Sequence, residues 1–457
     1  MLSTSQKSRF LRRSNNLLPT KNGGMEARPG ALQLLSGSVT DVTDWGSRLV
    51  VERGGRIQVF QSDGTLTDVD QAGRYVQGAN FQALTDNATR EDRLYIADGV
   101  RPLWYIALRN GSVVSESVQN AILDGSNNPY AIPVPTAITT WRGRLFLAYG
   151  SNRVQHCQFD APDTWDPIWT LECQGKKEDR IIAVEPFGDT LICGLNHSTW
   201  SISGDSPLNF KRRPVSDVGC AGPDSIATDE LAVYRVARDG IFSLSNQDAL
   251  SGDIEDIFGV SSISDNMVID KKQQLIFFVT RGRLFVLHMA TQRVGEITGF
   301  DVRGVFEWEG QIGWYGKDGL WLLMGRDLPD TYADGSQANV SSVFDTWDDI
   351  PNINGDGRAF LPRVVFRGKG SARQNVNYEL FVDGNSVFTD SQSLTDESVD
   401  TWADILASAA SGENWPTRAV RREFVPLVTG ESFRHQFSAD CHIEILDLLP
   451  QYQFGGS

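Results

Sequence analysis

Residues 274–287 read QLIFFVTRGRLFVL, and this stretch decides the fold class. Leu275–Val279 is apolar on both faces, Arg281-Gly282-Arg283 interrupts it, and Leu284–Leu287 resumes the apolar pattern. Branched and aromatic residues on both faces favour a strand that is covered on both sides. Glycine supplies the positive φ of a tight hairpin turn. The stretch therefore predicts a buried β-hairpin.

The same unit occurs seven times between about residue 45 and residue 325, and the spacing between first strands is 37 to 51 residues. The paired segments are 47–51 with 56–60, 92–96 with 103–106, 143–147 with 154–156, 189–193 with 200–202, 230–234 with 241–244, 274–279 with 284–287, and 311–315 with 320–322. A period of about 40–50 residues with a hairpin in every unit is typical of a β-propeller. Seven units predict seven blades, and six is the alternative if the first or last copy belongs to a neighbouring domain.

Composition agrees with an all-β chain. The 457 residues include 43 glycines and 12 tryptophans, and the net charge of −16 argues against general adhesion to nucleic acid or anionic membrane. The five cysteines are widely spaced, which predicts free thiols in a reducing compartment. They are Cys157, Cys173, Cys193, Cys220 and Cys441. We see no signal peptide and no membrane-spanning run, so we expect synthesis and folding in a cytoplasm.

Three regions follow from the pattern. Residues 1–28 are polar and basic, which predicts an extended arm without a core of its own. Residues 29–325 form the propeller. Residues 326–457 comprise an acidic linker and a C-terminal β-sandwich, with a hairpin at Asp383-Gly384 and one short helix near Val399–Ala410. The expected sandwich strands are 360–367, 376–382, 419–428, 433–438 and 442–452.

No pattern of catalytic or metal-ligating residues emerges. His156, His197, His288, His435 and His442 have no paired-ligand spacing, and GxSxG, P-loop and GxGxxG motifs are lacking. We therefore expect no catalytic, cofactor-binding or metal residues. The acidic segments 253–256 and 345–349 resemble solvated loops more than a glycosidase pair, and Asn352–Gly357 only weakly resembles a calcium loop.

Two further features bear on carbohydrate chemistry. Asp160–Trp165 shares the Asp, Thr and Trp of the aspartate box of sialidase-type propellers, but it lacks the leading Ser and the Gly and does not recur. Eight tryptophans within the repeats could stack on sugars, although their regular placement favours core packing. They are Trp104, Trp141, Trp165, Trp169, Trp200, Trp308, Trp314 and Trp321.

Several segments of the sequence together resemble the tail hub, or nozzle, proteins of short-tailed bacteriophages. The central segment runs from Ile181–Ile192 through Ser198–Asp205 and Val215–Ile226 to Ala237–Phe242. Four outer segments are also similar. They are Asn15–Pro19 with Arg28-Pro29-Gly30, Trp141–Leu145, Phe159–Trp165, and Phe433–Phe437 with Ile443–Ile445 and Gln451-Tyr452.

The resemblance implies a structural, non-enzymatic virion protein. It implies a homo-hexamer that docks on the adaptor (head-to-tail connector) ring below the portal, attaches distal tail needle or fibre proteins, and passes genome double-stranded DNA without sequence-specific binding. No cofactor and no membrane insertion are expected, and the location would be the virion tail, assembled in the bacterial host cytoplasm. The basic arm would dock on the adaptor through Arg9, Arg12, Arg13, Leu17 and Leu18. The alternatives are a carbohydrate-binding receptor-recognition propeller of the virion and a glycan-cleaving propeller enzyme.

Overall fold

The structure is a computed structural model that describes residues 13–454 with internal gaps. The gaps are residues 22–24, 62–63, 70–79, 87–90, 111, 125, 151, 174–178, 245–249, 251–265, 325–328, 339, 341, 346–358, 371–374, 384, 394–419, 425, 427, 431–432 and 440–442. All secondary structure in the described residues is β-strand, so the chain is all-β as predicted.

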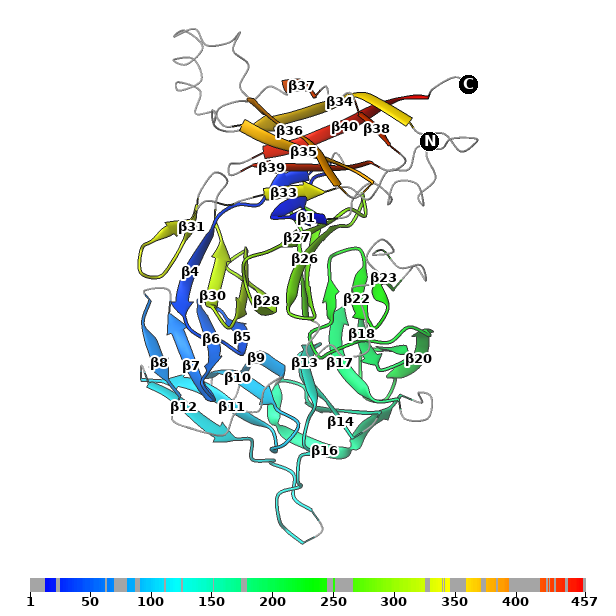
Figure 1. Ribbon diagram of the computed structural model, residues 1–457. Coiled ribbons are helices and arrows are strands. Elements are labelled where there is room, and N and C mark those ends of the chain that lie inside the picture. The colour runs from blue at the N-terminus through cyan, green and yellow to red at the C-terminus, as the bar shows by residue number, and fades with distance from the viewer. Residues whose placement is uncertain are drawn as a thin grey trace, which may run out of the picture.

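Seven antiparallel groups of three or four strands, which we call sheets one to seven, follow one another along the chain, and further strands extend sheets six and seven (Figure 1). Sheet one holds β5 (Asp41–Trp45), β6 (Arg48–Arg53), β7 (Arg56–Gln61) and β8 (Leu66–Asp68). Sheet two holds β9 (Asn80–Asp86), β10 (Glu91–Ala97), β11 (Trp104–Arg109) and β12 (Ser112–Ser117). Sheet three holds β13 (Ala137–Trp141), β14 (Arg144–Tyr149), β15 (Arg153–Gln158) and β16 (Ala161–Glu172).

The remaining sheets repeat this order. Sheet four holds β17 (Ile181–Phe187), β18 (Thr190–Leu195), β19 (Thr199–Ser203) and β20 (Lys211–Ser216). Sheet five holds β21 (Ile226–Thr228), β22 (Val233–Ala237) and β23 (Gly240–Ser243). Sheet six holds β24 (Asn266–Asp270), β25 (Leu275–Thr280), β26 (Arg283–His288) and β27 (Val294–Ile297). Sheet seven holds β28 (Val302–Trp308), β29 (Gln311–Gly316) and β30 (Gly319–Leu323).

Each hairpin predicted from the sequence forms the second and third strands of one sheet. In the stretch that decided the fold class, β25 pairs with β26, and all six residues of β25 are buried. Arg281 and Gly282 connect these strands with φ values of 52° and 73°. Two consecutive positive φ angles are those of a type I′ turn, whose twist matches that of the flanking strands. The seven predicted hairpins are confirmed.

A buried apolar cluster joins every sheet to the next one and the last sheet to the first. Phe306 and Trp308 of sheet seven, for example, share one cluster with Val42 and Leu49 of sheet one. Equivalent clusters lie at the six other junctions. The first strands of neighbouring sheets also contact one another, as β28 does with β5. The sheets are therefore arranged in a ring, which fits a β-propeller.

A strand from the N-terminal region completes sheet seven. β4 (Ala31–Ser36) pairs antiparallel with β30, so that Leu32 lies opposite Leu322 and Leu35 opposite Leu320. β31 (Asp330–Thr331) then pairs with β4, and β32 (Gln337–Ala338) pairs with β31. The two ends of the ring segment are thereby held together by backbone hydrogen bonds.

The strands before β4 join two larger sheets at one end of the ring (Figure 1). β1 (Arg13–Asn15) lies between β27 of sheet six and β33 (Ser342–Asp345), which leads to β39 (Phe433–Ala439), β35 (Asn375–Val382) and β36 (Asn385–Ser393). The second sheet has the order β2 (Leu17–Pro19), β3 (Met25–Ala27), β40 (Ile443–Phe454), β34 (Ala359–Gly370) and β37 (Val420–Phe424), with β38 (Val428–Gly430) paired to β34.

These pairings correct one expectation. Residues 13–27 do not form an arm without a core, because each of their strands pairs with another part of the chain. Leu17 is fully buried, and Leu18 is 7 % exposed in the cluster between sheets six and seven. The Asp383 hairpin and four of the five expected C-terminal strands are confirmed, whereas the region expected as one strand, 419–428, holds β37 and the start of β38. Tyr378 of β35 is buried, and its hydroxyl lies 2.8 Å from Nδ1 of His435. The helix expected near 399–410 lies outside the described residues, and the sandwich packing stays a prediction.

A buried ion pair links the segment before β4 to β31, where the two ends of the ring meet. The Arg28 guanidinium donates to both carboxylate oxygens of Asp330, at 2.7 and 2.6 Å, and its Nε donates to Oδ1 of Asn16 at 3.1 Å. The backbone N–H of Ala31 also donates to Asp330, at 2.8 Å. Arg28 and Asp330 are 3 % and 7 % exposed. Such a paired, hydrogen-bonded geometry is what a buried charge requires.

Candidate functional site: an acidic cavity in the ring

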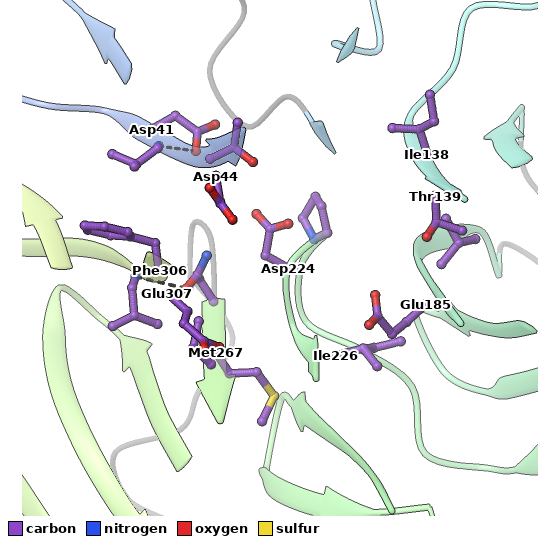
Figure 2. A pocket seen from close by; sticks show the side chains of 17 residues that line it. Asp41, Asp44, Ile138, Thr139, Glu185, Asp224, Ile226, Met267, Phe306 and Glu307 are labelled. Carbon is purple, nitrogen blue, oxygen red and sulfur yellow. Dashed lines mark hydrogen bonds between the residues drawn. The ribbon is translucent and has the colours of Figure 1, made fainter. Parts of the chain in front are cut away.

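A cavity of about 260 Å³ lies where the first strands of several sheets face one another (Figure 2). Five carboxylates line it, and they come from strands or turns of sheets one, four, five and seven. They are Asp41, Asp44, Glu185, Asp224 and Glu307. The lining includes no lysine or arginine. The site is therefore a concentration of negative charge.

Asp44 lies at the exposed side of this cavity, at the end of β5. Partial desolvation raises the pKa of its carboxyl to about 6, and the charges of Glu307 and Glu309 add to the rise. All three residues are exposed, and two of them precede or follow Trp308 at the β28–β29 turn. We call Asp44, Glu307 and Glu309 the acidic mouth. Like charges in one place disfavour ionisation, so the mouth is a region of electrostatic strain.

Glu185 lies deeper, on β17. Burial raises the pKa of its carboxyl to about 7, and the charge of Asp224 contributes to the rise. A hydrogen bond with Thr228 and the charge of Lys271 act in the opposite direction without cancelling it. At neutral pH a large fraction of Glu185 is therefore protonated. Figure 2 shows Glu185 and Asp224 among the side chains that line the cavity.

This arrangement suits cationic groups better than sugars or a metal ion. A concentration of carboxylates attracts ammonium or guanidinium groups. Within the described residues, no group of three or more His, Cys, Asp or Glu side chains is placed to hold a metal. The one aromatic ring in the lining, that of Phe306, is 4 % exposed, so the cavity has no platform on which a sugar could stack.

We predict that Glu185→Gln stabilises the protein at pH 8 and leaves its stability nearly unchanged at pH 4. The folded-state pKa of about 7 lies above the ordinary value of 4.5, so wild-type stability is lost as the pH rises through this interval. Glutamine imitates the protonated form, and the gain at pH 8 should be on the order of 2 kcal/mol. Urea unfolding at several pH values measures it. The exposed control Glu230→Gln should keep the wild-type slope, and an unchanged slope in Glu185→Gln would contradict the prediction.

The histidines of the described residues do not line this cavity. His156 and His435 are each 1 % exposed, and burial lowers the pKa of both to about 4, so they are neutral. His288 is also buried, whereas His197 is exposed, and His442 lies outside the described residues. Cys157, Cys173, Cys193 and Cys220 are free and buried, as predicted, and Cys441 is outside the described part.

Most of the tryptophans pack in the core, as expected. Trp104, Trp141, Trp165, Trp308, Trp314 and Trp321 are at most 7 % exposed, while Trp169 and Trp200 are half-buried. In the segment that resembles an aspartate box, Trp165 Nε1 donates to the Pro162 carbonyl at 2.6 Å, and Asp163 forms an ion pair with Arg93 at 3.0 Å. Arg93 also pairs with Asp86 and Glu91, at 2.9 and 2.8 Å. This segment therefore ties sheets two and three together.

Of the residues expected to dock on an adaptor, the structure describes Arg13, Leu17 and Leu18. Leu17 and Leu18 are buried within the chain, so they cannot fill a partner's groove, and that part of the prediction is wrong. The reason is the pairing of β2 with β3 and its packing on β27. Arg13 belongs to β1, and Arg9 and Arg12 lie outside the described residues, so a docking role for these arginines stays a prediction. The acidic clusters at 253–256 and 346–349 and the segment 352–357 are also outside the described part.

The sequence does not reveal the cavity directly, because its acidic residues are single positions far apart along the chain. A signal does exist: Asp44-Trp45 and Glu307-Trp308 both stand directly before a turn that contains glycine, Gly46 and Gly310 respectively. Aligning the repeats on these turns would have placed the two acids at one equivalent position. Because first strands line the inside of a propeller ring, equivalent acids there converge.

Comparisons with known proteins find structural neighbours but no matching family. No family model and no curated protein matches it. Among solved structures it is similar to the computationally designed Ika8 protein, with a TM-score of 0.40, 14 % identity, and coverage of 65 % of this chain and 99 % of that one. It is similar to the extracellular domain of a putative hybrid two-component system from B. thetaiotaomicron, with a TM-score of 0.45, 10 % identity, and coverage of 83 % of this chain and 57 % of that one. It is also similar to the Pan2 WD40 domain of Neurospora crassa, with a TM-score of 0.41, 10 % identity, and coverage of 68 % of this chain and 98 % of that one. In the described residues no helix has the length and apolar character needed to cross a bilayer.

Proposed function

We propose that this chain is a structural, non-enzymatic component of a short-tailed bacteriophage tail, the hub or nozzle that forms a ring below the adaptor. Six copies would surround the tail axis, join the adaptor ring to distal tail needle or fibre proteins, and let genome DNA pass. We further infer that the ring of sheets is a seven-bladed propeller and that the C-terminal strands form a sandwich beside it.

The observation that carries this proposal is that residues of the central segment that resembles the phage proteins, within Val215–Ile226, have structural roles. A Cβ atom on Gly219 would lie 2.3–2.4 Å from backbone atoms of Leu195 and Asn196, so this position requires glycine. Cys220, next to it, is 2 % exposed in the cluster between sheets four and five. Residues that resemble the family thus meet packing demands, as expected for a protein whose function is to be a stiff part of an assembly.

The charge balance is compatible with a conduit for DNA. Affinity for DNA grows with every phosphate that a cation neutralises, so a tube that must release DNA should present few cations to it. Six copies with a net charge of −16 each would carry about 96 negative formal charges. An acidic wall would leave the duplex free to slide.

The test is the mass and binding behaviour of the purified chain. Six chains of 50.5 kDa predict a particle of about 300 kDa by mass photometry, and ring-shaped particles in negative-stain images. The particles should bind purified adaptor rings. Single chains that do not join the adaptor would contradict the proposal. If such chains bound sugars on a glycan array, the receptor-recognition module would be favoured, and if they hydrolysed a polysaccharide, the glycan-cleaving enzyme would be favoured.

A further inference from the structure

The outer edge of sheet four carries an exposed basic strand. Lys211, Arg212 and Arg213 of β20 are all exposed, and β20 is the last strand of its sheet, paired only with β19. Arg212 donates to the Glu172 carbonyl at 2.5 Å, and Arg213 donates to Ser201 Oγ at 3.4 Å. No carboxylate in the described residues forms an ion pair with any of the three. Three neighbouring free cations are unusual on a chain with a net charge of −16.

A fully exposed leucine stands beside this strand. Leu208 is 100 % exposed in the turn between β19 and β20. Oδ1 of Asn209 accepts hydrogen bonds from the N–H groups of Asp205 and Ser206, both at 3.0 Å, and the Asn209 N–H donates to the Ser206 carbonyl at 3.0 Å. The turn is thereby fixed, and it presents an apolar side chain next to three positive charges. An apolar contact with a charged rim is the usual composition of a protein interface.

We propose that the basic edge, Lys211–Arg213 with Leu208, docks against the acidic mouth, Asp44, Glu307 and Glu309, of a second copy of this chain. The inference rests on the proposed function and identifies the contact between neighbouring copies of the ring. The contact is heterologous, because two different surfaces of each copy meet, and such contacts close into rings when the rotation permits.

Charge complementarity favours the acidic mouth of a second copy as the partner of the basic edge. Partial desolvation raises the pKa of Asp44, and the charges of Glu307 and Glu309 add to the rise. Three cations from a neighbour would relieve this repulsion among the carboxylates of the mouth. The association should accelerate at low salt and weaken as salt screens charges beyond about 8–10 Å. DNA phosphates would also attract three cations, but they offer no apolar surface to Leu208, and the rest of the chain repels them.

Charge reversal tests the contact in the full-length chain. Variant one is Lys211→Glu, Arg212→Glu and Arg213→Glu together, and variant two is Asp44→Lys, Glu307→Lys and Glu309→Lys together. In mass photometry and sedimentation velocity, wild type should assemble, and each variant alone should remain at the 50.5 kDa of one chain. An equimolar mixture should assemble again, because each acidic edge then meets a basic mouth and each basic edge an acidic mouth.

The control variant Arg56→Glu, Arg153→Glu, Arg238→Glu has the same change in net charge at three other exposed positions and should assemble like wild type. Circular dichroism and melting curves confirm that all variants fold. If either reversed variant assembles like wild type, or their mixture does not assemble, the docking inference fails while the proposed function stands. If variant one loses only the binding of duplex DNA, the edge is a phosphate-binding surface and the inference also fails. Single-chain wild type would overturn both proposals.

Discussion

Replacing Asp330 with alanine should lower the free energy of unfolding by about 3–5 kcal/mol. The substitution removes the acceptor of two guanidinium hydrogen bonds and of the Ala31 N–H, and it leaves Arg28 buried without a counter-charge. It should therefore loosen the closure of the ring at β4 and β31. Guanidinium unfolding followed by tryptophan fluorescence measures the loss.

Two comparisons make this prediction sharp. Asp189→Ala removes a carboxylate at a similar distance from its arginine, 2.7 Å from Arg142, but its side chain is 96 % exposed, so the cost should stay below about 1 kcal/mol. The double variant Arg28→Met, Asp330→Leu removes both charges and should be more stable than Asp330→Ala, since no buried charge is left alone. Equal losses in Asp330→Ala and Asp189→Ala would show that the buried pair does not support the closure.

Gly295→Ala should be comparably damaging, with a loss of about 3 kcal/mol or more. A Cβ atom at this position of β27 would lie 1.9 Å from the carbonyl oxygen of Leu17. A backbone carbonyl cannot rotate away as a side chain can, so β2 would be displaced and Leu17 and Leu18 would lose their buried contacts. We expect a lower melting temperature together with faster proteolysis within residues 13–27.

A glycine in open space provides the control for Gly295→Ala. Gly150 has a φ of 62° and no atom near the place of a Cβ, and asparagine tolerates this backbone conformation. Gly150→Asn should cost less than about 1 kcal/mol. If Gly295→Ala keeps both the wild-type melting temperature and the wild-type resistance of its N-terminal strands, then β2 does not depend on this close approach.

The hairpins could be predicted from the sequence because their cause is local. In β25 and β26 the apolar residues and the turn at Arg281-Gly282 lie within one short stretch, so the pattern and the turn point to the same structure. The same local agreement recurs in the other six sheets. The sequence alone was therefore sufficient to predict each of the seven hairpins.

The N-terminal strands could not be predicted in this way. β1, β2 and β3 have three residues each, which is too short for a periodic pattern. β1 and β3 pair with strands hundreds of residues away, and the hairpin of β2 and β3 packs on the equally distant β27. Arg28 and Asp330 are 302 positions apart, so nothing local marks them as a pair. The basic composition of residues 1–28 suggested a free arm, but tertiary pairing decides the outcome for residues 13–27.

The acidic cavity was hidden for a related reason. Glu185 and Asp224 look like ordinary surface acids in the sequence, and only the ring brings them into one cavity with Asp44 and Glu307. The raised pKa values of Asp44 and Glu185 depend on burial and on nearby carboxylates, which are properties of the assembled fold. The basic strand β20 was equally inconspicuous, because its exposure depends on its place at the edge of a sheet.

The pairing of β4 with β30, and of β3 with β40, also has a consequence for the order of events at the ribosome. The earlier strands must wait for their partners: Leu32 cannot meet Leu322, nor Glu26 meet Glu444, until those later residues have been synthesised. Contacts of such high sequence separation slow folding and prolong the exposure of unpaired strand edges. The nascent chain should therefore depend on protection from aggregation until β40 has emerged.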